Sequence, residues 1–238
     1  MYRLADLNIQ LKSMYSYVHN QCEAYLFPSL PNLTVSIEQR DIDLERRKSA
    51  REDARMGRQD LTYPDLYLET LAVYRKIAEA LPNFDGFVFH GSAMAVEKQG
   101  YIIAAPSGTG KSTHARLWRE LLGRKVLMVN DDKPIIRFKG SQPFVYGSPW
   151  DGKEELSNNI SVPLKAICFL ERAQENHITE INDQEALPLL VRQTYRPSAV
   201  QALQKTLALL DKLNVKKYRL YCNMDKSAAE LSHRIMKG

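Results

Sequence analysis

Residues 104–118 read AAPSGTGKSTHARLW and contain a glycine-rich turn between two segments of different character. The run GYIIAA before the glycines predicts a strand, and Thr113 to Leu122 after them predict a helix that Gly123 closes. A turn of this kind points successive backbone N–H groups toward the N-terminal end of the helix, which makes an anion-binding site. The alternative is a simple strand–turn–helix joint with an exposed lysine.

The turn nearly matches the phosphate-binding pattern G-x-x-x-x-G-K-[ST], with Ala105 in place of the first glycine. Alanine is tolerated at that position if its backbone stays extended, because only a positive φ requires glycine. Lys111 is expected to reach the β- and γ-phosphates of ATP, and the Ser112 hydroxyl is expected to bind Mg²⁺. The residues expected to bind the nucleotide are Ser107, Gly108, Thr109, Gly110, Lys111, Ser112 and Thr113.

Two adjacent acids follow the next apolar run, KVLMVNDDKP. Asp131 and Asp132 end a predicted strand, so we expect them at the same sheet edge as the glycine turn. One carboxylate could hold Mg²⁺ while the other accepts a proton from an attacking hydroxyl, and the sequence does not say which does which. Solvated turn acids before Pro134 are the alternative interpretation.

His90 lies in FVFHGSA, on the predicted strand that pairs with the strand before the glycine turn. A histidine among apolar residues is often a satisfied core residue. Its pairing with the loop strand, followed by Gly91 and Ser92, makes it equally a candidate active-site residue.

The turn EKQG separates two apolar runs within residues 84–106. Parallel neighbours need a crossover of about a dozen residues, so this short turn predicts an antiparallel hairpin. DKPIIRFKGSQPFVYG (residues 132–147) predicts a second hairpin. Strands over 164–173, 176–182 and 217–224 and helices over 184–195, 198–213 and 225–237 complete a predicted α/β (α+β) fold with a mixed, partly antiparallel sheet.

Residues 1–60 predict a small N-terminal α/β module with a charged linker, and residues 61–238 predict the main domain. Strand-like alternation covers 2–11 and 33–39, and helical spacing joins them. The charged stretch 41–60 is expected to be a solvated loop or an exposed helix, with a partner-docking surface as the alternative. After Pro64, residues 65–81 predict an amphipathic helix that Pro82 ends.

A net charge of +5 permits anionic ligands such as phosphate, and the lack of a dense basic stripe argues against nucleic acid as a partner. No apolar run approaches bilayer length and the start lacks a signal-peptide core, so we expect a cytoplasmic protein without a membrane partner. Cys22, Cys168 and Cys222 have no metal or redox spacing and are expected to be reduced thiols. The sequence leaves a homo-oligomer open.

The order His90–Gly91, APSGTGKST, Asp131–Asp132 resembles the HPr kinase/phosphorylase and phosphoenolpyruvate carboxykinase superfamily over residues 84–225. Within it, the chain looks most like bacterial HPr-kinase-related, carboxykinase-like proteins, some of which accompany ribosomal peptide pathways and phosphorylate a serine. The resemblance implies that Lys111 and Ser112 handle phosphate and Mg²⁺, that the acid pair supplies the metal ligand and the base, and that His90 lies beside them.

Two further stretches could contact a ligand. GSPWDGKEELSNN (residues 147–159) carries Trp150, Asp151, Lys153 and Glu154 and would suit peptide contact, or its Trp packs down as an anchor. Arg192 and Arg196 could clamp an anion, although arginines at a helix C-terminus commonly only complement the helix dipole.

These observations predict an ATP- and Mg²⁺-dependent kinase that transfers the γ-phosphoryl group to a hydroxyl, a serine of a protein or peptide being favoured. A small-molecule kinase or carboxykinase-like enzyme is an alternative within the same class. A nucleotide-gated protein that binds and delivers a peptide is an alternative from another class.

Overall fold

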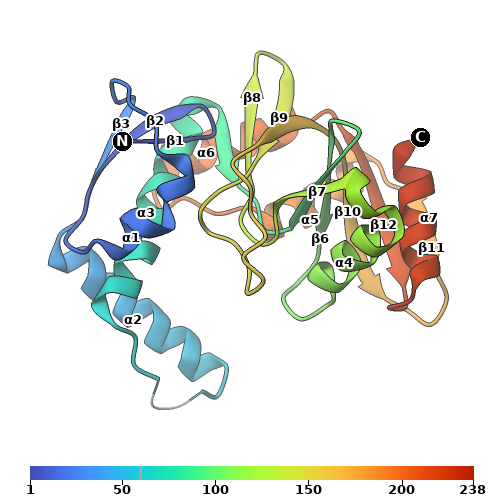
Figure 1. The fold of residues 1–238 in the computed structure, drawn as a ribbon. Helices are drawn as coiled ribbons and strands as arrows, with labels where there is room; N and C mark the ends of the chain where they lie inside the picture. The colour runs from blue at the N-terminus through green and yellow to red at the C-terminus, as the bar shows by residue number, and fades with distance from the viewer. Residues whose placement is uncertain (59–60) are drawn as a thin grey trace. The chain divides into compact units, whose positions relative to one another are not determined.

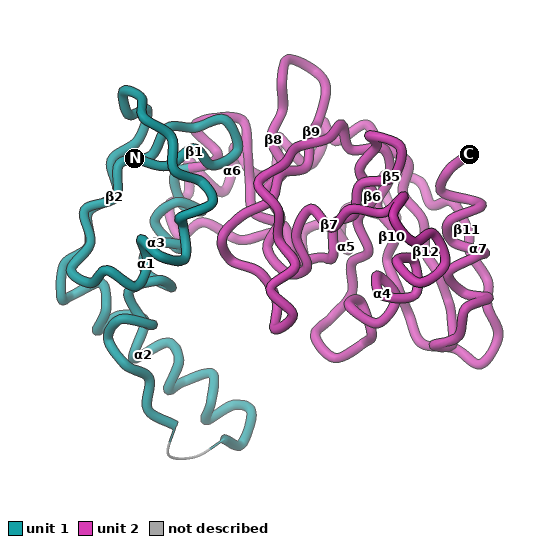
Figure 2. The backbone as a smooth tube through the Cα atoms, in the orientation of Figure 1, with its two compact units in different colours: residues 1–80 teal, residues 81–238 magenta. Residues whose placement is uncertain are grey.

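The computed structural model describes residues 1–58 and 61–238 and divides the chain into two compact units, Met1–Ala80 and Leu81–Gly238 (Figures 1 and 2). The expected boundary after residue 60 differs from this division. Helix α3 (Asp65–Ala80) packs against α1, α2 and β3, which places it in the first unit. Residues 59 and 60 of the expected charged linker lie outside the described residues.

The first unit is built on a three-stranded sheet in the order β1–β2–β3, with β1 and β2 antiparallel and β2 and β3 parallel. Its elements are β1 (Tyr2–Leu4), β2 (Leu7–Lys12), α1 (Tyr17–Gln21), η1 (Glu23–Tyr25), β3 (Leu33–Ser36), α2 (Gln39–Arg55) and α3. Leu7, Ile9 and Leu11 of β2 are buried, as the alternation of this segment predicts.

The charged stretch after residue 41 forms most of α2, and one side of this helix is buried rather than solvated. Asp41 and Glu45 are 8% and 6% exposed. Arg75 of α3 donates to both carboxylates, at 3.1 Å to Asp41, and Lys76 donates to Asp41 at 2.6 Å. Ion pairs thus join α2 to α3 where a simple amphipathic pattern would have placed apolar side chains.

The second unit contains a mixed sheet in the order β4–β8–β9–β10–β6–β5–β7, with β12 pairing with β10 and β11. Its strands are β4 (Gly86–Val88), β5 (Ser92–Val96), β6 (Gln99–Ala104), β7 (Val126–Asn130), β8 (Ile135–Lys139), β9 (Gln142–Tyr146), β10 (Ser161–Arg172), β11 (His177–Glu180) and β12 (Lys216–Cys222). Its helices are η2 (Leu81–Phe84), α4 (Lys111–Leu122), η3 (Gly123–Lys125), α5 (Asp183–Gln193), α6 (Val200–Asp211) and α7 (Lys226–Lys237).

Both predicted hairpins are present, and the mixed, partly antiparallel α/β fold class is confirmed. β5 and β6 pair antiparallel around Glu97 and Lys98, whose φ angles of 51° and 63° permit the two-residue turn. β8 and β9 also pair antiparallel. β6, β10 and β12 are parallel neighbours, so the strand before the glycine turn lies where the two kinds of pairing meet.

The single strand expected before EKQG is instead two strands. β4 pairs with β8 and β5 pairs with β6 and β7, and the chain bends between them at Phe89–Gly91. A Cβ on Gly91 would lie 2.7 Å from Ile102 Cγ2 of β6, so any residue with a side chain would clash at this position. The bend removes His90 from the regular strand pairing.

Helices cover both faces of this sheet (Figure 1). Ile102 and Ile167 face one apolar cluster together with Leu190 of α5 and Leu209 of α6. Neighbouring strand residues face the opposite cluster, to which Trp118 of α4 and Met236 of α7 belong. None of the described helices has both the length and the apolar composition needed to cross a membrane. Cys22, Cys168 and Cys222 are free and buried.

A polar contact inside the second cluster fixes α4 to α7. The Ser232 hydroxyl lies 2.9 Å from His114 Nε2 and accepts a hydrogen bond from Trp118 Nε1 at 2.9 Å. His114 is fully buried, and burial lowers its pKa to about 4. The imidazole of His114 is therefore neutral in the folded protein.

We expect the free energy of unfolding to fall as the pH drops from about 6.5 to about 4. In this range His114 binds a proton in the unfolded chain but stays neutral in the folded chain. The pKa difference of about 2.5 corresponds to about 3 kcal/mol. Urea unfolding of wild type and His114→Gln at each pH measures this, and the variant should lose less stability over that range. His177→Gln, at an exposed position, is the control and should follow the wild type. Equal pH slopes for wild type and His114→Gln would contradict this origin.

Candidate functional site

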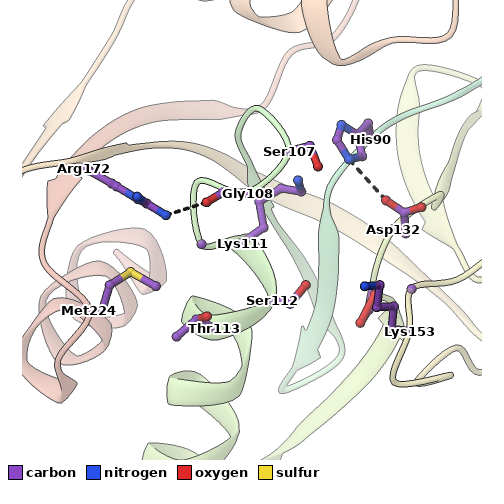
Figure 3. Close-up of a pocket in the computed structure, with 13 residues that line it drawn as sticks. His90, Ser107, Gly108, Lys111, Ser112, Thr113, Asp132, Lys153, Arg172 and Met224 are labelled. Carbon is purple, nitrogen blue, oxygen red and sulfur yellow. Dashed lines mark hydrogen bonds and ion pairs between the residues drawn. The ribbon is translucent and has the colours of Figure 1, made fainter. Parts of the chain in front are cut away.

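A pocket of about 430 Å³ lies over the glycine turn, at the N-terminal end of α4 (Figure 3). It is lined by His90, Ser107, Gly108, Gly110, Lys111, Ser112, Thr113, Asp131, Asp132, Gly152, Lys153, Arg172 and Met224. Most of the residues that the sequence singled out are therefore brought together. Thr109 does not line the pocket, and neither Arg192 nor Arg196 does.

The turn between β6 and α4 requires two of its glycines. Gly108 and Gly110 have φ angles of +77° and +124°, which side chains rarely allow. A Cβ on Gly110 would also lie 2.5 Å from Met224 Cε. Ala105 is not among the residues with positive φ, so its replacement of the first glycine introduces no backbone strain.

Lys111 is the first residue of α4 and is 8% exposed. Its ammonium group donates to the Ala105 carbonyl at 3.1 Å, back across the turn. Burial lowers the pKa of Lys111, while the charges of Asp132 and Asp131 act in the opposite direction. Ser112 follows on the same turn, and its hydroxyl points toward the side of the pocket that holds Asp132 (Figure 3).

Asp131 and Asp132 follow β7 and differ sharply in their surroundings. Asp131 is 4% exposed, and its Oδ1 has no hydrogen-bond partner among the described residues. Burial raises the pKa of Asp131, and the negative charge of Asp132 adds to this. Burial acts the same way on Asp132, but a hydrogen bond from His90 and the charge of Lys133 outweigh it, so the pKa of Asp132 is lowered.

His90 is held at both ring nitrogens. Its Nε2 lies 3.2 Å from Asp132 Oδ1, and its Nδ1 lies 3.0 Å from Gln193 Oε1 at the end of α5. The backbone fixes the same arrangement, because His90 N donates to the Gln193 carbonyl and Gly91 N donates to the Asp132 carbonyl. His90 is therefore a polar residue that faces the pocket and not a core histidine.

The structure adds Asn130, which sequence reasoning missed. Its Oδ1 accepts from the backbone N–H groups of Asp132 and Lys133 at 2.9 and 2.6 Å. Its amide nitrogen donates to the carbonyls of Ser148 and Trp150 at 3.0 and 3.2 Å. One buried side chain thus fixes the acid pair and the loop that follows β9. Its place directly before Asp-Asp-Lys-Pro, where Asn favours tight turns, was the available signal.

The loop after β9 is an anchored segment that reaches the pocket. Trp150 is 8% exposed, so it packs down as an anchor and is not an exposed contact residue. Glu154 pairs with Arg119 of α4 at 3.0 Å. Gly152 passes so close to Asp131 that a Cβ there would lie 2.3 Å from Oδ1. Lys153, between Gly152 and Glu154 in the sequence, is exposed and lines the pocket.

Arg172 and Met224 form the opposite side of the pocket (Figure 3). The Arg172 guanidinium donates to the carbonyls of Gly108 and Thr109 at 2.5 and 3.1 Å. These two hydrogen bonds tie the end of β10 to the glycine turn. Arg172 ends the long strand β10, and nothing in its local sequence indicates this contact.

The residues at this site fit a magnesium ion bound together with a nucleotide. Mg²⁺ takes oxygen ligands and keeps several waters, so one or two protein oxygens suffice when phosphates supply others. The unpartnered, buried Asp131 Oδ1 is such an oxygen, and burial makes its negative charge costly without a cation. Among the described residues no group of three or more acidic, His or Cys side chains forms a self-sufficient metal site.

Asn130→Asp is expected to lower the free energy of unfolding by about 2–4 kcal/mol, because a carboxylate oxygen would replace the amide that donates to buried carbonyls. Urea unfolding measures the loss, and hydrogen exchange at the Asp132 and Lys133 amides should show local opening. Gln204→Glu, the same amide-to-acid change at an exposed position of α6, is the control. Unchanged stability and exchange in Asn130→Asp would show that the acid pair is held by other contacts.

Comparison with known proteins gives one family and a distant structural neighbour. The structure described as "Structure of the Hpr(Ser) kinase/phosphatase from Coxiella burnetii" matches with a TM-score of 0.36 and 11% identity, over 63% of this chain and 99% of that chain. A TM-score this low carries no argument about activity. No curated protein matches the chain significantly.

The family model described as "SynChlorMet cassette protein ScmC" matches residues 58–235, which is about three quarters of the chain. This stretch includes the glycine turn, the acid pair, His90 and Arg172. The chain belongs to the ScmC family of SynChlorMet cassette proteins.

Proposed function

We propose that this protein is an ATP- and Mg²⁺-dependent kinase that transfers the γ-phosphoryl group to the hydroxyl of a serine in a peptide or protein. The observation that carries the proposal is the His90–Asp132 contact, at 3.2 Å, in the same pocket as Lys111 and the glycine turn. A site that only binds nucleotide needs the turn, the lysine and one acid. A second acid that is hydrogen-bonded to a histidine is typical of a general base in a catalytic site.

The phosphates of ATP would lie over the turn. The backbone N–H groups of Gly108, Gly110 and Lys111 and the N-terminal end of α4 would offer donors and positive potential there, while the Thr109 N–H donates to the Pro106 carbonyl. Lys111 is buried, and its ammonium group would exchange the Ala105 carbonyl for phosphate oxygens. Ser112 and Asp131 would hold Mg²⁺, which supplies charge neutralisation at the phosphates.

Asp132 would accept the proton of the attacking hydroxyl. The serine oxygen would form a bond to the γ-phosphorus while the bond to the bridging oxygen of ADP breaks, and the proton would pass to the Asp132 carboxylate. His90 orients this carboxylate, and Gln193 fixes the histidine ring from the other side. Most of the rate gain would come from positioning and from charge neutralisation in a partly buried site.

A peptide acceptor is favoured over a small dianionic metabolite. Such a metabolite needs several converging cations, since buried carboxylates must be paired. Beside the acid pair the pocket offers Lys153, while Lys133 is engaged with Asp132 at 3.1 Å and Arg172 with the turn. Arg192 and Arg196 lie outside the pocket.

Lys111→Met is expected to weaken ATP binding by about 100-fold or more, because it removes the buried charge that faces the phosphates while keeping the apolar stem. Isothermal titration calorimetry with ATP and Mg²⁺ measures the affinity, and circular dichroism checks that the variant is folded. Lys125→Met, at the exposed end of η3, is the control. Wild-type affinity in a folded Lys111→Met protein would refute the nucleotide site.

Asp132→Asn is expected to retain ATP affinity and lose kcat by about 10²–10⁴-fold, as expected when a general base is removed. Asp131→Asn is expected instead to raise the Mg²⁺ concentration needed for half-maximal binding of ATP, because a metal ligand is lost. Transfer of label from γ-labelled ATP to a library of serine-containing peptides measures turnover. Calorimetry over a Mg²⁺ series measures metal dependence without turnover.

The alternatives give different results in the same assays. Label on small hydroxyl compounds in preference to any peptide would indicate a small-molecule kinase. Tight ATP binding with no transfer to any acceptor, and an ATP-dependent change in peptide affinity, would indicate a nucleotide-gated delivery protein.

A further inference from the structure

A second pocket, of about 250 Å³, adjoins the first behind the start of the glycine turn. It is lined by Ala104, Ala105, Pro106, Phe169, Leu170, Glu171, Leu189, Arg192 and Gln193. Three elements contribute: the end of β6, the end of β10 and the last turns of α5. We call it the α5 pocket.

Residues that line the α5 pocket neighbour residues that line the first pocket at three places. Pro106 lines the α5 pocket and Ser107, the next residue, lines the first. Gln193 lines the α5 pocket and also lies 3.0 Å from the ring of His90, which lines the first. Glu171 lines the α5 pocket and Arg172, the next residue, lines the first, so the two pockets also approach each other at the Arg172 end. The Gln193 contact joins the α5 pocket to the acid pair through His90.

The first pocket has two different ends (Figure 3). Thr113, Arg172 and Met224 lie at one end. His90 and Asp132 lie at the other, next to Ser107 and on the side toward which the Ser112 hydroxyl points. If the phosphates follow the turn, the γ-phosphate faces His90 and Asp132, and the acceptor must approach from that end because phosphoryl transfer is in line.

The floor of the α5 pocket is apolar. Phe169 and Ala104 are paired in register on β10 and β6 and are 4% and 0% exposed. Pro106 and the half-buried Leu189 complete the apolar wall. Such a floor gains free energy by covering apolar surface and offers nothing to a phosphate or a ribose.

The rim of the α5 pocket carries one acid, Glu171, and one base, Arg192. Glu171 is paired with Arg219 at 3.4 Å. Arg192 is exposed, and within residues 1–58 and 61–238 no hydrogen-bond or ion-pair partner occupies its guanidinium. The rim thus holds one unpaired cation beside an apolar floor.

We infer that the α5 pocket is the acceptor-recognition subsite of this kinase, and that it takes an apolar side chain of a peptide whose neighbouring residue is acidic. The peptide would place its serine at Asp132 and His90, its apolar side chain against Phe169 and Leu189, and its carboxylate at Arg192. This inference rests on the proposed function. Gln193 would link peptide binding to proton transfer. It lines the α5 pocket, and it contacts His90, which orients the Asp132 carboxylate.

The test is transfer from γ-labelled ATP to a positional-scanning library of peptides that share one fixed serine. The wild type is expected to prefer an apolar residue and an acidic residue close to the serine. Leu189→Trp fills the subsite and should lower kcat/KM for the preferred peptides by about 10- to 100-fold. Its kcat/KM for library members with glycine at the apolar position should stay unchanged, as should ATP affinity.

Arg192→Glu tests the rim independently, on an exposed residue whose replacement leaves the core intact. It should reverse the acidic preference into a basic one while the apolar preference remains. Leu187→Trp and Arg196→Glu are the matched controls, since both residues are exposed and lie outside the α5 pocket. Both controls should keep the wild-type profile.

The outcomes separate this inference from the proposed function. Labelled peptides with a profile that neither Leu189→Trp nor Arg192→Glu changes would overturn the subsite and leave the kinase standing. No label on any peptide would overturn both the peptide-kinase proposal and the subsite. Loss of the apolar preference in one variant and reversal of the charge preference in the other would establish the subsite.

Discussion

The hydrogen bonds of Asn130 are the constraint on which the rest of the site depends. A single buried amide accepts from the backbone of the acid pair and donates to the carbonyls of the loop after β9. Neither segment has regular secondary structure, so neither can satisfy its own backbone groups. Because the amide is fully buried, the alternatives to these bonds are unpaired polar groups, and the arrangement is held firmly. Asp131, Asp132 and Gly152 derive their positions from it.

The fold was largely predictable from local sequence patterns. The short turn at Glu97 and Lys98 required antiparallel pairing, and alternating apolar residues located most strands. The break between β4 and β5 was not predictable, because residues 84–96 read as one apolar run and the bend is set by contacts with Gln193 and Asp132, far away in sequence. Helix α2 was ambiguous for a similar reason, since its acids are satisfied by cations of α3.

The part of the candidate site that is formed by contiguous motifs was predictable from the sequence. The part that is formed by residues far apart in the sequence was not. The glycine turn, Lys111, Ser112 and the acid pair are contiguous patterns, and the structure gathers them in one pocket. Gln193, Arg172 and Met224 reach the site from α5, β10 and the segment after β12. Such residues carry no local signature, because they reach the site through distant parts of the chain: β10 pairs with β6 and β12, and the end of α5 contacts the bend at His90.

The pairing of strand β10 also has a consequence for the order in which the chain can fold during synthesis. Its first residues pair with β9, and its later residues lie between β6 and β12. β9 and β6 precede β10 in the chain, whereas β12 follows it by more than forty residues. One edge of β10 therefore stays open while the ribosome makes α5 and α6, and an open edge is a template for pairing with another chain. A nascent chain that stalls before β12 would expose one edge of this apolar strand, whose last residue, Arg172, holds the glycine turn.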